Sequence, residues 1–219
     1  LIADSADGHG LRELAEQTSA VCSAVGPYAR HGSELVAACV DRATHYCDIS
    51  GESPWMQRMI TEHHARARER GVRVVLSCGY ESVPSDLAVL LLQQHARERY
   101  GVPSRRVHAL TFIKGCPPSG GSAASRLDLL EEAVSNERVR QLLSDPFALV
   151  PNGHAVHADR RERHGPGFEW SGRVFTAPFL IAPSNVQIVH RSNALLDYAY
   201  GRDFSYREAL PTGKGVRGA

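Results

Sequence analysis

The first hundred residues alternate between short apolar runs and longer amphipathic runs, a pattern typical of strands that are each followed by a helix. Apolar runs at 20–25, 44–49 and 72–76 predict three strands. In the third, only Arg73 interrupts a series of β-branched and leucine side chains. That composition favours a strand buried on both faces, as in a parallel sheet.

Serine and proline residues mark where helices are expected to begin. Ser33 precedes a run with 3.6-residue apolar spacing, and Ser53-Pro54 opens the next helix as cap and first residue. That helix ends in basic residues before Gly71. After the third strand, a helix is expected from Ser85 to about Tyr100, with Ser82 and Asp86 holding its start.

Strands joined by helices of this length form a parallel sheet through right-handed crossovers. Their carboxyl ends then meet at one edge, so the loops Gly26-Pro27, Ser50-Gly51 and Cys78-Gly79 are expected to lie together. In open α/β sheets, ligands bind beyond that edge. The sequence therefore predicts an α/β fold with a doubly wound parallel sheet and a functional site in these loops.

The pattern changes after Gly101-Val102-Pro103, which we interpret as a boundary between a domain at 1–103 and an α+β domain at 104–219. The stretch 151–166 is expected to be an exposed excursion, and Pro178 and Pro183 are expected to limit strand formation in 168–181. The remaining expected elements are a strand at 107–113 and helices at 123–134, 137–143 and 192–198.

Composition excludes several classes of protein. With 25 basic and 24 acidic residues among 219, the net charge of +1 gives no electrostatic basis for binding nucleic acid. No apolar run approaches the roughly 20 residues that a membrane helix needs. Five cysteines without a C-x-x-C pair indicate reduced thiols and a cytoplasmic protein. The chain opens on Leu1, and both ends suggest a fragment of a longer protein.

Several separate segments carry a family resemblance. VGPYARHGSELVAACVDRATHYCDISGE and SCGYESVPSDLAV resemble the saccharopine dehydrogenase-like oxidoreductases, and SGGSAASRLDLLEEA, DPFAL, APFLIAPSNVQIVHRSNALL and YGRDFSYREA are similar to the bacterial trans-acting enoyl reductases. The resemblance covers about 20–210. It implies an NADP-linked enzyme with a Rossmann-like domain, followed by a domain for substrate contact and dimerisation. It also implies reduction of enoyl groups on lipid or polyketide-type acyl chains.

The chain departs from that pattern at its amino-terminal side. The glycine-rich G-x-G-x-x-G loop that holds a pyrophosphate is missing, and 7–10 does not replace it because no apolar strand precedes it. We therefore expect this chain by itself to bind NADPH weakly or not at all and to be inactive. The residues that choose between NADP and NAD, and those that decide the substrate, also lie outside it.

The strand-end loops supply the candidate cofactor-binding residues. A glycine at a strand end lets the backbone approach a dinucleotide, although a plain tight turn explains the same residues. Similarly, Asp48 and Glu52 could orient a cofactor or substrate hydroxyl, or Glu52 could only favour the start of the next helix. The candidates are Gly26, Pro27, Tyr28, Ser50, Gly51, Cys78 and Gly79.

Tyr80 and Glu81 are the candidate catalytic residues, because a hydroxyl or carboxylic acid could supply the proton that enoyl reduction requires. Packing explains Tyr80 equally well. Cys78 is interpreted as structural rather than nucleophilic, since no histidine partner is near in sequence. No metal site is expected, because the histidines at 63–64 and 154–157 lack a supporting ligand cluster.

A second hypothesis fits the lack of a convincing acid–base pair. On that reading the protein is a non-catalytic member of the fold that acts as a homodimeric or membrane-peripheral interaction module. The first hypothesis instead expects a small-molecule or acyl-chain substrate. Both expect a homodimer, and peripheral membrane association stays open.

Overall fold

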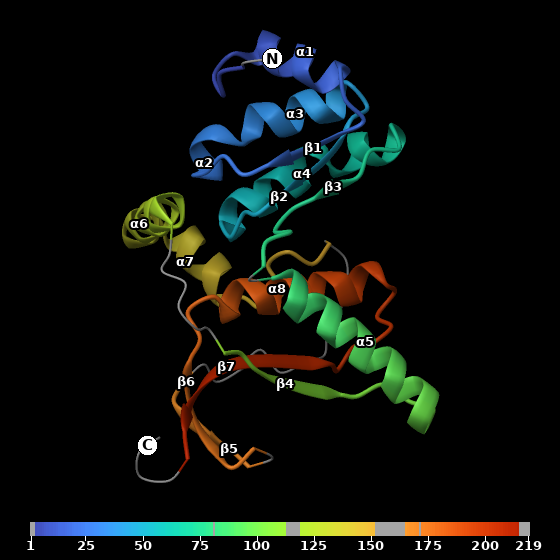
Figure 1. Ribbon diagram of the computed structural model, residues 1–219, viewed down its shortest axis with the longest axis vertical. Helices are drawn as coiled ribbons and strands as arrows, with labels where there is room; N and C mark the ends of the chain where they lie inside the picture. Colours follow the sequence, from blue (N-terminus) through green and yellow to red (C-terminus); the bar gives the residue numbers. More distant parts are fainter. Residues whose placement is uncertain (1–2, 81, 113–118, 152–164, 171, 215–219) are drawn as a thin grey trace. The chain divides into compact units, whose positions relative to one another are not determined.

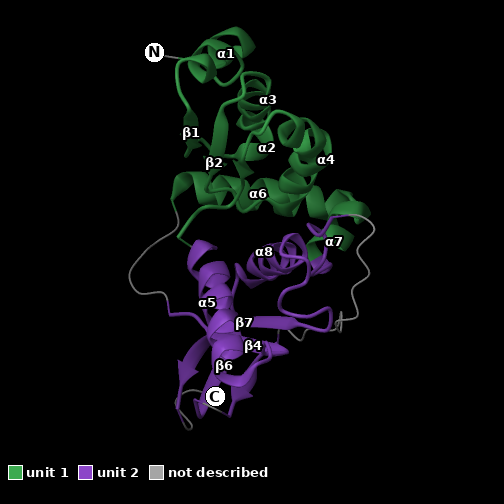
Figure 2. Cartoon of the chain, turned by 90° about the vertical axis from the view of Figure 1, so that its right-hand side faces the viewer, with its two compact units in different colours: residues 1–80, 117–143 green, residues 81–116, 144–219 purple. Residues whose placement is uncertain are grey.

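A computed structural model describes residues 3–80, 82–112, 119–151, 165–170 and 172–214. The chain forms two compact units, shown in different colours in Figure 2. The first comprises residues 1–80 and 117–143, and the second comprises residues 81–116 and 144–219. The described residues contain eight helices and seven strands, which confirms the predicted α/β class.

The first unit is built on a three-stranded parallel sheet with the order β1-β2-β3. Its strands are β1 (Ala20–Ser23), β2 (His45–Asp48) and β3 (Val74–Val75). Cys22 lies opposite Cys47, and Cys47 lies opposite Val75. Because all strands run the same way, their carboxyl ends and the loops that follow share one edge, as the sequence predicts.

Helices on this unit bury a mostly apolar core. Helix α3 packs against α1, α4 and β2, and Val40, Ala67 and Val72 form one buried cluster. Trp55 and Met59 are almost fully buried beside them. The helices are α1 (Gly8–Glu16), α2 (Tyr28–His31), α3 (Ser33–Asp41), α4 (Ser53–Glu69), α6 (Gly120–Ser135) and α7 (Glu137–Ser144).

The prediction of a third strand buried on both faces is wrong. β3 has two residues, and the Val75 side chain is 50% exposed. Among the described strands, β3 pairs only with β2 and lies at the edge of the sheet. The buried residues of this segment are Val72, before the strand, and Ser77, after it. Near the start of the chain, α1 begins after its N-cap Asp7, whose side chain accepts a hydrogen bond from the His9 N–H at 3.1 Å.

The serines expected to cap helices have other partners. Ser33 is the first residue of α3, and its hydroxyl accepts a hydrogen bond from the Trp55 indole at 3.0 Å. Ser53 likewise lies inside α4, with Pro54 in the first turn. Ser82 is the N-cap of α5 but makes no capping bond, because its hydroxyl donates to Asn185 Oδ1 at 2.9 Å. Tertiary partners therefore replace local caps here.

The second unit has a mixed four-stranded sheet with the order β4-β7-β6-β5. β4 and β7 are parallel, and the other two pairs are antiparallel. Helices α5 and α8 lie along the same side of the β4–β7 pair (Figure 1). The elements are β4 (Arg106–Leu110), β5 (Gly167–Glu169), β6 (Val174–Pro178), β7 (Ser205–Gly213), α5 (Val83–Tyr100) and α8 (Ala182–Leu195).

The core of this unit joins both helices to the sheet. Aromatic residues after α8 complete it, with the Tyr200 and Phe204 rings 5.3 Å apart between centroids. Burying these large rings is a major source of stability for a unit of this size. The buried cluster consists of Val89, Val107, Val186, Val189, Tyr200, Phe204 and Tyr206.

Two features of the second unit differ from the sequence expectations. Helix α8 begins at Ala182 rather than at 192, because Pro183 occupies the first turn, where no N–H is required. The expected limit on strand formation is confirmed at Pro178, where β6 ends. β7, which contains Pro211 and charged residues, has no counterpart among the expected strands.

The two compact units do not divide at residue 103, because α5 packs on α8 and α6 belongs with the first unit. Which unit binds cofactor and which binds substrate stays a prediction. The expected excursion at 151–166 lies almost wholly outside the described residues.

Gly32→Ala is expected to destabilise the protein by about 1–3 kcal/mol, the usual cost of overpacking. An added Cβ would lie 2.7 Å from Trp55 Cζ2 and 2.9 Å from the Tyr28 carbonyl oxygen. Urea denaturation measures the loss. Gly120→Ala is the matched control, since nothing lies within 4 Å of its Cβ position, and an equal loss in both variants would contradict the prediction.

Candidate functional site

The three strand-end loops of the first unit are held by two buried carboxylates. The first, Asp48, is the last residue of β2 and is fully buried. Its Oδ1 accepts hydrogen bonds from the Ser50 N–H at 3.0 Å, the Ser50 hydroxyl at 2.7 Å and the Ser77 N–H at 2.8 Å. Its backbone carbonyl accepts a further bond from the Cys78 N–H at 2.6 Å. Asp48 therefore ties the loop after β2 to the loop after β3.

Burial governs the titration of Asp48. It raises the pKa of the carboxyl above its usual value, although the bonds from Ser50, Ser77 and Tyr46 act in the opposite direction. The Tyr46 hydroxyl donates to Oδ2 at 3.1 Å and is itself buried, which raises the pKa of the phenol. The carboxylate is thus enclosed by donors rather than presented to a ligand.

The second carboxylate, Glu52, holds the loop after β1. It accepts hydrogen bonds from the N–H groups of Tyr28 and Ala29 at 2.8 and 2.7 Å, at the start of α2. The sequence left two roles open for Glu52: orienting a ligand hydroxyl or supporting the start of a helix. The structure shows helix support, but the helix is α2 rather than α4. At the start of α4, Glu52 makes no side-chain capping bond. Like Asp48, it is almost fully buried.

The polar groups of Tyr28 also form hydrogen bonds within the protein. Its hydroxyl donates to the Ser23 carbonyl at 2.9 Å and accepts from the Ile49 N–H at 3.3 Å. Burial raises its pKa to about 12. Neither its hydroxyl nor its N–H is free to bind a ligand, so a cofactor contact by Tyr28 would have to use its ring or carbonyl group.

Helix α6 contributes residues that the sequence reasoning did not connect to the loops. Ser125 donates to Glu52 Oε1 at 2.8 Å and lies 3.8 Å from where a Gly26 Cβ would be. Asp128 forms an ion pair with Arg30. Ser125 is 73 residues from Glu52 and Asp128 is 98 residues from Arg30, and no local signal in the sequence identifies these pairs.

The remaining candidate residues lie at the same sheet edge, and some of them are exposed to solvent. Gly51 is exposed, and nothing lies within 4 Å of where its Cβ would be, so a ligand could approach its backbone. Gly79 faces Ile49 at ordinary contact distance. Tyr80 is 87% exposed and makes no hydrogen bond with any described residue. Glu81 lies outside the described residues. Ser50, Gly51, Cys78 and Gly79 thus come together with Gly26 and Pro27 at one sheet edge.

Three cysteines lie near one another on this sheet. Cys22 and Cys47 are opposite each other in adjacent strands, and Cys78 follows β3. Burial and the neighbouring Cys22 thiol raise the pKa of Cys47 to about 11, and burial raises that of Cys78. A raised pKa keeps a thiol protonated and unreactive at neutral pH, which supports the structural interpretation of Cys78.

The second unit contains its own buried carboxylate, Glu208 of β7. Asn185 Nδ2 donates to it at 2.8 Å and the Tyr206 hydroxyl at 3.3 Å. The Ser85 hydroxyl donates at 3.2 Å, and the Thr111 hydroxyl is a further donor. These bonds join α5, α8 and the end of β4 around β7. Asp86, in the first turn of α5, accepts a bond from Ser192 at 2.9 Å.

Within the described ranges, no group of three or more His, Cys, Asp or Glu side chains is arranged to hold a metal ion. None of the helices in that part of the chain is both long and apolar enough to cross a membrane.

The chain has homologues among named enzymes. A provisionally named trans-acting enoyl reductase of Mycobacterium tuberculosis is 39% identical over 225 aligned residues, which cover 99% of this chain and 53% of the relative. Trans-acting enoyl reductases of Mycobacterium ulcerans and Mycobacterium bovis are 35% and 34% identical, with coverage of 98% and 99% of this chain and 53% of each relative. The chain therefore spans about half the length of the curated relatives it matches.

No family model and no solved structure matches the chain. The similarity to trans-acting enoyl reductases is thus found over the full chain, as the sequence motifs suggested. The wider grouping with saccharopine dehydrogenase-like proteins, and the use of NADP, stay predictions.

Asp48→Ala is expected to lower the free energy of unfolding, because each buried N–H left without an acceptor costs about 1–3 kcal/mol. Asp48→Asn keeps an acceptor oxygen and should lose less. Urea denaturation compares the two, and equal losses would show that the hydrogen bonds are not what Asp48 contributes.

The pH dependence of stability provides a second readout for Asp48. Its folded-state pKa is raised, so the folded protein holds this proton more tightly than the unfolded chain. Its contribution is therefore greatest in acid and is lost as pH rises through the folded pKa. From acidic to neutral buffer, the parent should lose more unfolding free energy than Asp48→Asn; parallel curves would be the contrary result.

Alkylation should distinguish the cysteines. Iodoacetamide reacts with thiolates, so buried Cys39 and half-buried Cys47, with pKa values of about 12 and 11, should stay unmodified in the native protein at neutral pH. Exposed Cys22 serves as the internal reference. Peptide mass spectrometry measures each site, and labelling of Cys47 as fast as Cys22 would oppose the assignment.

Proposed function

We propose that this chain is part of an NADP-dependent enoyl reductase that acts on lipid or polyketide-type acyl chains. The observation that carries the proposal is the similarity to proteins named trans-acting enoyl reductases, at 34–39% identity over 98–99% of this chain. A parallel sheet whose loops meet at one edge supports it, because dinucleotides bind at that edge in related α/β architectures.

The loops at this edge fit one part of a dinucleotide. Gly51 leaves open space beside its backbone, where a side chain would otherwise stand. The N–H and hydroxyl of Ser50 both donate to Asp48, so the loop that contains Gly51 is ordered without a ligand. Gly26 and Gly79 border the same edge. In our proposal the backbone of these loops contacts the nicotinamide side of NADP, and the second unit contributes substrate contacts.

Reduction of an enoyl thioester adds a hydride at the β-carbon and a proton at the α-carbon. NADPH supplies the hydride when it is bound. The proton must come from a group at the site, and Tyr80 follows Gly79 directly with a hydroxyl that no described residue engages. We assign Tyr80 the role of proton donor. The buried carboxylates Asp48 and Glu52 are excluded from it, since their oxygens are used by the loops.

The test uses the full-length gene product with NADPH and an enoyl thioester. Gly51→Val should weaken NADPH binding at least tenfold without loss of stability, because the added side chain meets no described atom but would meet the cofactor. Ala65→Val, on the exposed face of α4, is the matched control. Fluorescence titration of NADPH measures binding, and equal affinities for both variants would remove the loop from the cofactor site.

Tyr80→Phe should lower kcat by about 100-fold or more, the usual contribution of general acid catalysis, while NADPH affinity stays unchanged. An unchanged kcat would exclude Tyr80 as the proton donor. If the gene product binds no NADPH and reduces no enoyl thioester, the reductase proposal fails, and the non-catalytic interaction module becomes the better explanation. Analytical ultracentrifugation then tests whether it is a homodimer.

A further inference from the structure

The second unit contains a cavity of about 190 Å³ that the proposed reductase function does not use. It lies where the pairing of β6 with β7 ends, at Pro178 opposite Ala209. Beyond that point, no described strand lies beside β7 on the β6 side. The turn from β6 into α8 forms the wall with Pro178, Phe179, Leu180 and Pro183.

Two charged residues of β7, Arg207 and Glu208, line this cavity. Arg207 is partly buried and forms no hydrogen bond or ion pair with any described residue. Two other arginines of the unit do have partners: Arg105 pairs with Asp203, and Arg191 donates to the Leu149 carbonyl. The Arg207 side chain lines the cavity with donors that no described residue engages, and a guanidinium is well suited to bind a carboxylate through two parallel hydrogen bonds.

The carboxylates nearest in sequence and on the sheet are already engaged. Glu208 is surrounded by its hydroxyl and amide donors, and Glu169 lies 3.1 Å from His108 Nδ1. The fold also makes room for the guanidinium, because a Cβ on Gly167 would lie 3.1 Å from Arg207 Nη2. Among the described residues, therefore, no carboxylate is paired with Arg207, and its guanidinium is able to bind an external anion.

We propose that this cavity binds a short aliphatic carboxylate. The guanidinium of Arg207 binds the carboxylate, and the apolar wall of the cavity contacts the aliphatic chain. Since a water molecule occupies about 30 Å³ of liquid, the cavity holds roughly six groups of that size, which suits an acyl group of about four carbons. The proposal requires neither NADP nor reductase activity, so it stands or falls separately from the proposed function.

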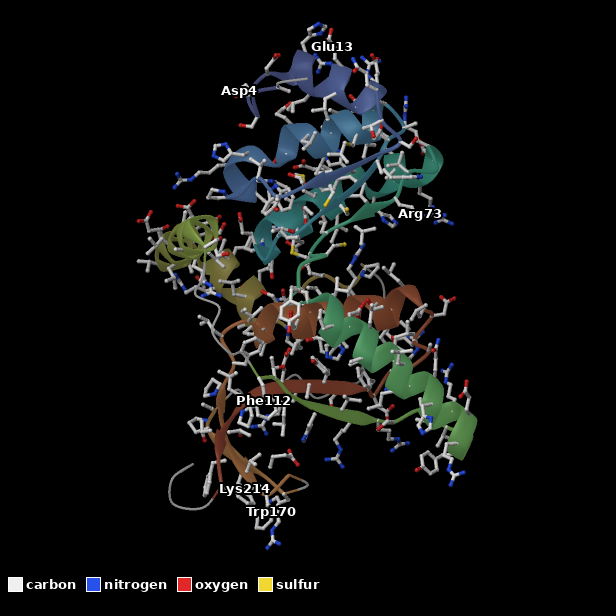
Figure 3. The ribbon with its side chains drawn as sticks, viewed as in Figure 1. Asp4, Glu13, Arg73, Phe112, Trp170 and Lys214 are labelled. Carbon is white, nitrogen blue, oxygen red and sulfur yellow. The ribbon has the colours of Figure 1, made fainter. Side chains whose placement is uncertain are left out.

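The exposed aromatic surface of the same unit is a separate feature. Trp170, between β5 and β6, is 82% exposed and projects away from the strands, and Phe112 is 77% exposed (Figure 3). Phe179, by contrast, is buried and faces the cavity. The cavity is therefore lined by Phe179 and not by Trp170.

Butyrate is the probe, and calorimetry or NMR titration of the full chain without cofactor is the measurement. We expect saturable binding in the millimolar range or tighter, with 1-butanol binding much more weakly because it has no carboxylate and acetate more weakly because it has no tail. Butanol binding as tightly as butyrate would overturn the assignment, as would no saturable butyrate binding.

Variants locate the site. Arg207→Gln should weaken butyrate binding at least tenfold, and Arg207→Lys should weaken it less, because an ammonium keeps the charge but not the bidentate geometry. Arg106→Gln, an exposed arginine on neighbouring β4, is the matched control and should bind as the parent does. Thermal melting confirms folding of each variant. Parent-like affinity in folded Arg207→Gln would overturn the proposal.

A final comparison identifies the source of the acyl group. S-Butyryl-N-acetylcysteamine carries the same tail as a thioester. If it competes with butyrate and depends on Arg207, the site accepts the carbonyl oxygen of a carried acyl group. If it does not compete, the site is confined to free carboxylates, and either result leaves the Arg207 dependence of butyrate binding as the deciding measurement.

Discussion

The constraint on which this structure depends is that a carboxylate removed from water must be surrounded by hydrogen-bond donors. Asp48 and Glu52 meet it in the first unit with backbone N–H groups and hydroxyls from segments that are distant in sequence. Glu208 meets it in the second unit with an amide and three hydroxyls from both helices and the sheet. Because an unsatisfied donor or acceptor would be costly, each carboxylate fixes the segments that reach it.

This arrangement separates the atoms that build the candidate site from the atoms that could act in it. The side chains of Asp48, Glu52 and Tyr28 hold the loops and are not available to a ligand. Among the described residues of this edge, Gly51 and the Tyr80 side chain are exposed, and nothing lies within 4 Å of the Gly51 Cβ position. Such a division is common where a rigid loop must present backbone groups to a cofactor, because precise placement requires support from behind.

Arg207 is the contrasting case. The buried carboxylates have their full set of donors, whereas this partly buried guanidinium has no acceptor among the described residues beside an apolar cavity. A buried charge with a full set of donors indicates structural support, whereas a charged group that lines a cavity without a described partner suits a ligand. In our proposal the second unit therefore carries a binding feature of its own.

The sequence by itself determined the α/β class, the first three strands and the meeting of Gly26, Gly51 and Gly79 at one edge, because apolar periodicity and the parallel rule act locally. It also identified the similarity to trans-acting enoyl reductases. Only the tertiary structure decided that Ser33 and Ser82 bind Trp55 and Asn185 rather than cap their helices. It likewise decided that Glu52 accepts hydrogen bonds from the start of α2 and from Ser125. Those choices depend on partners 22 to 103 residues away, which compete with local preferences and leave no periodic trace in the chain.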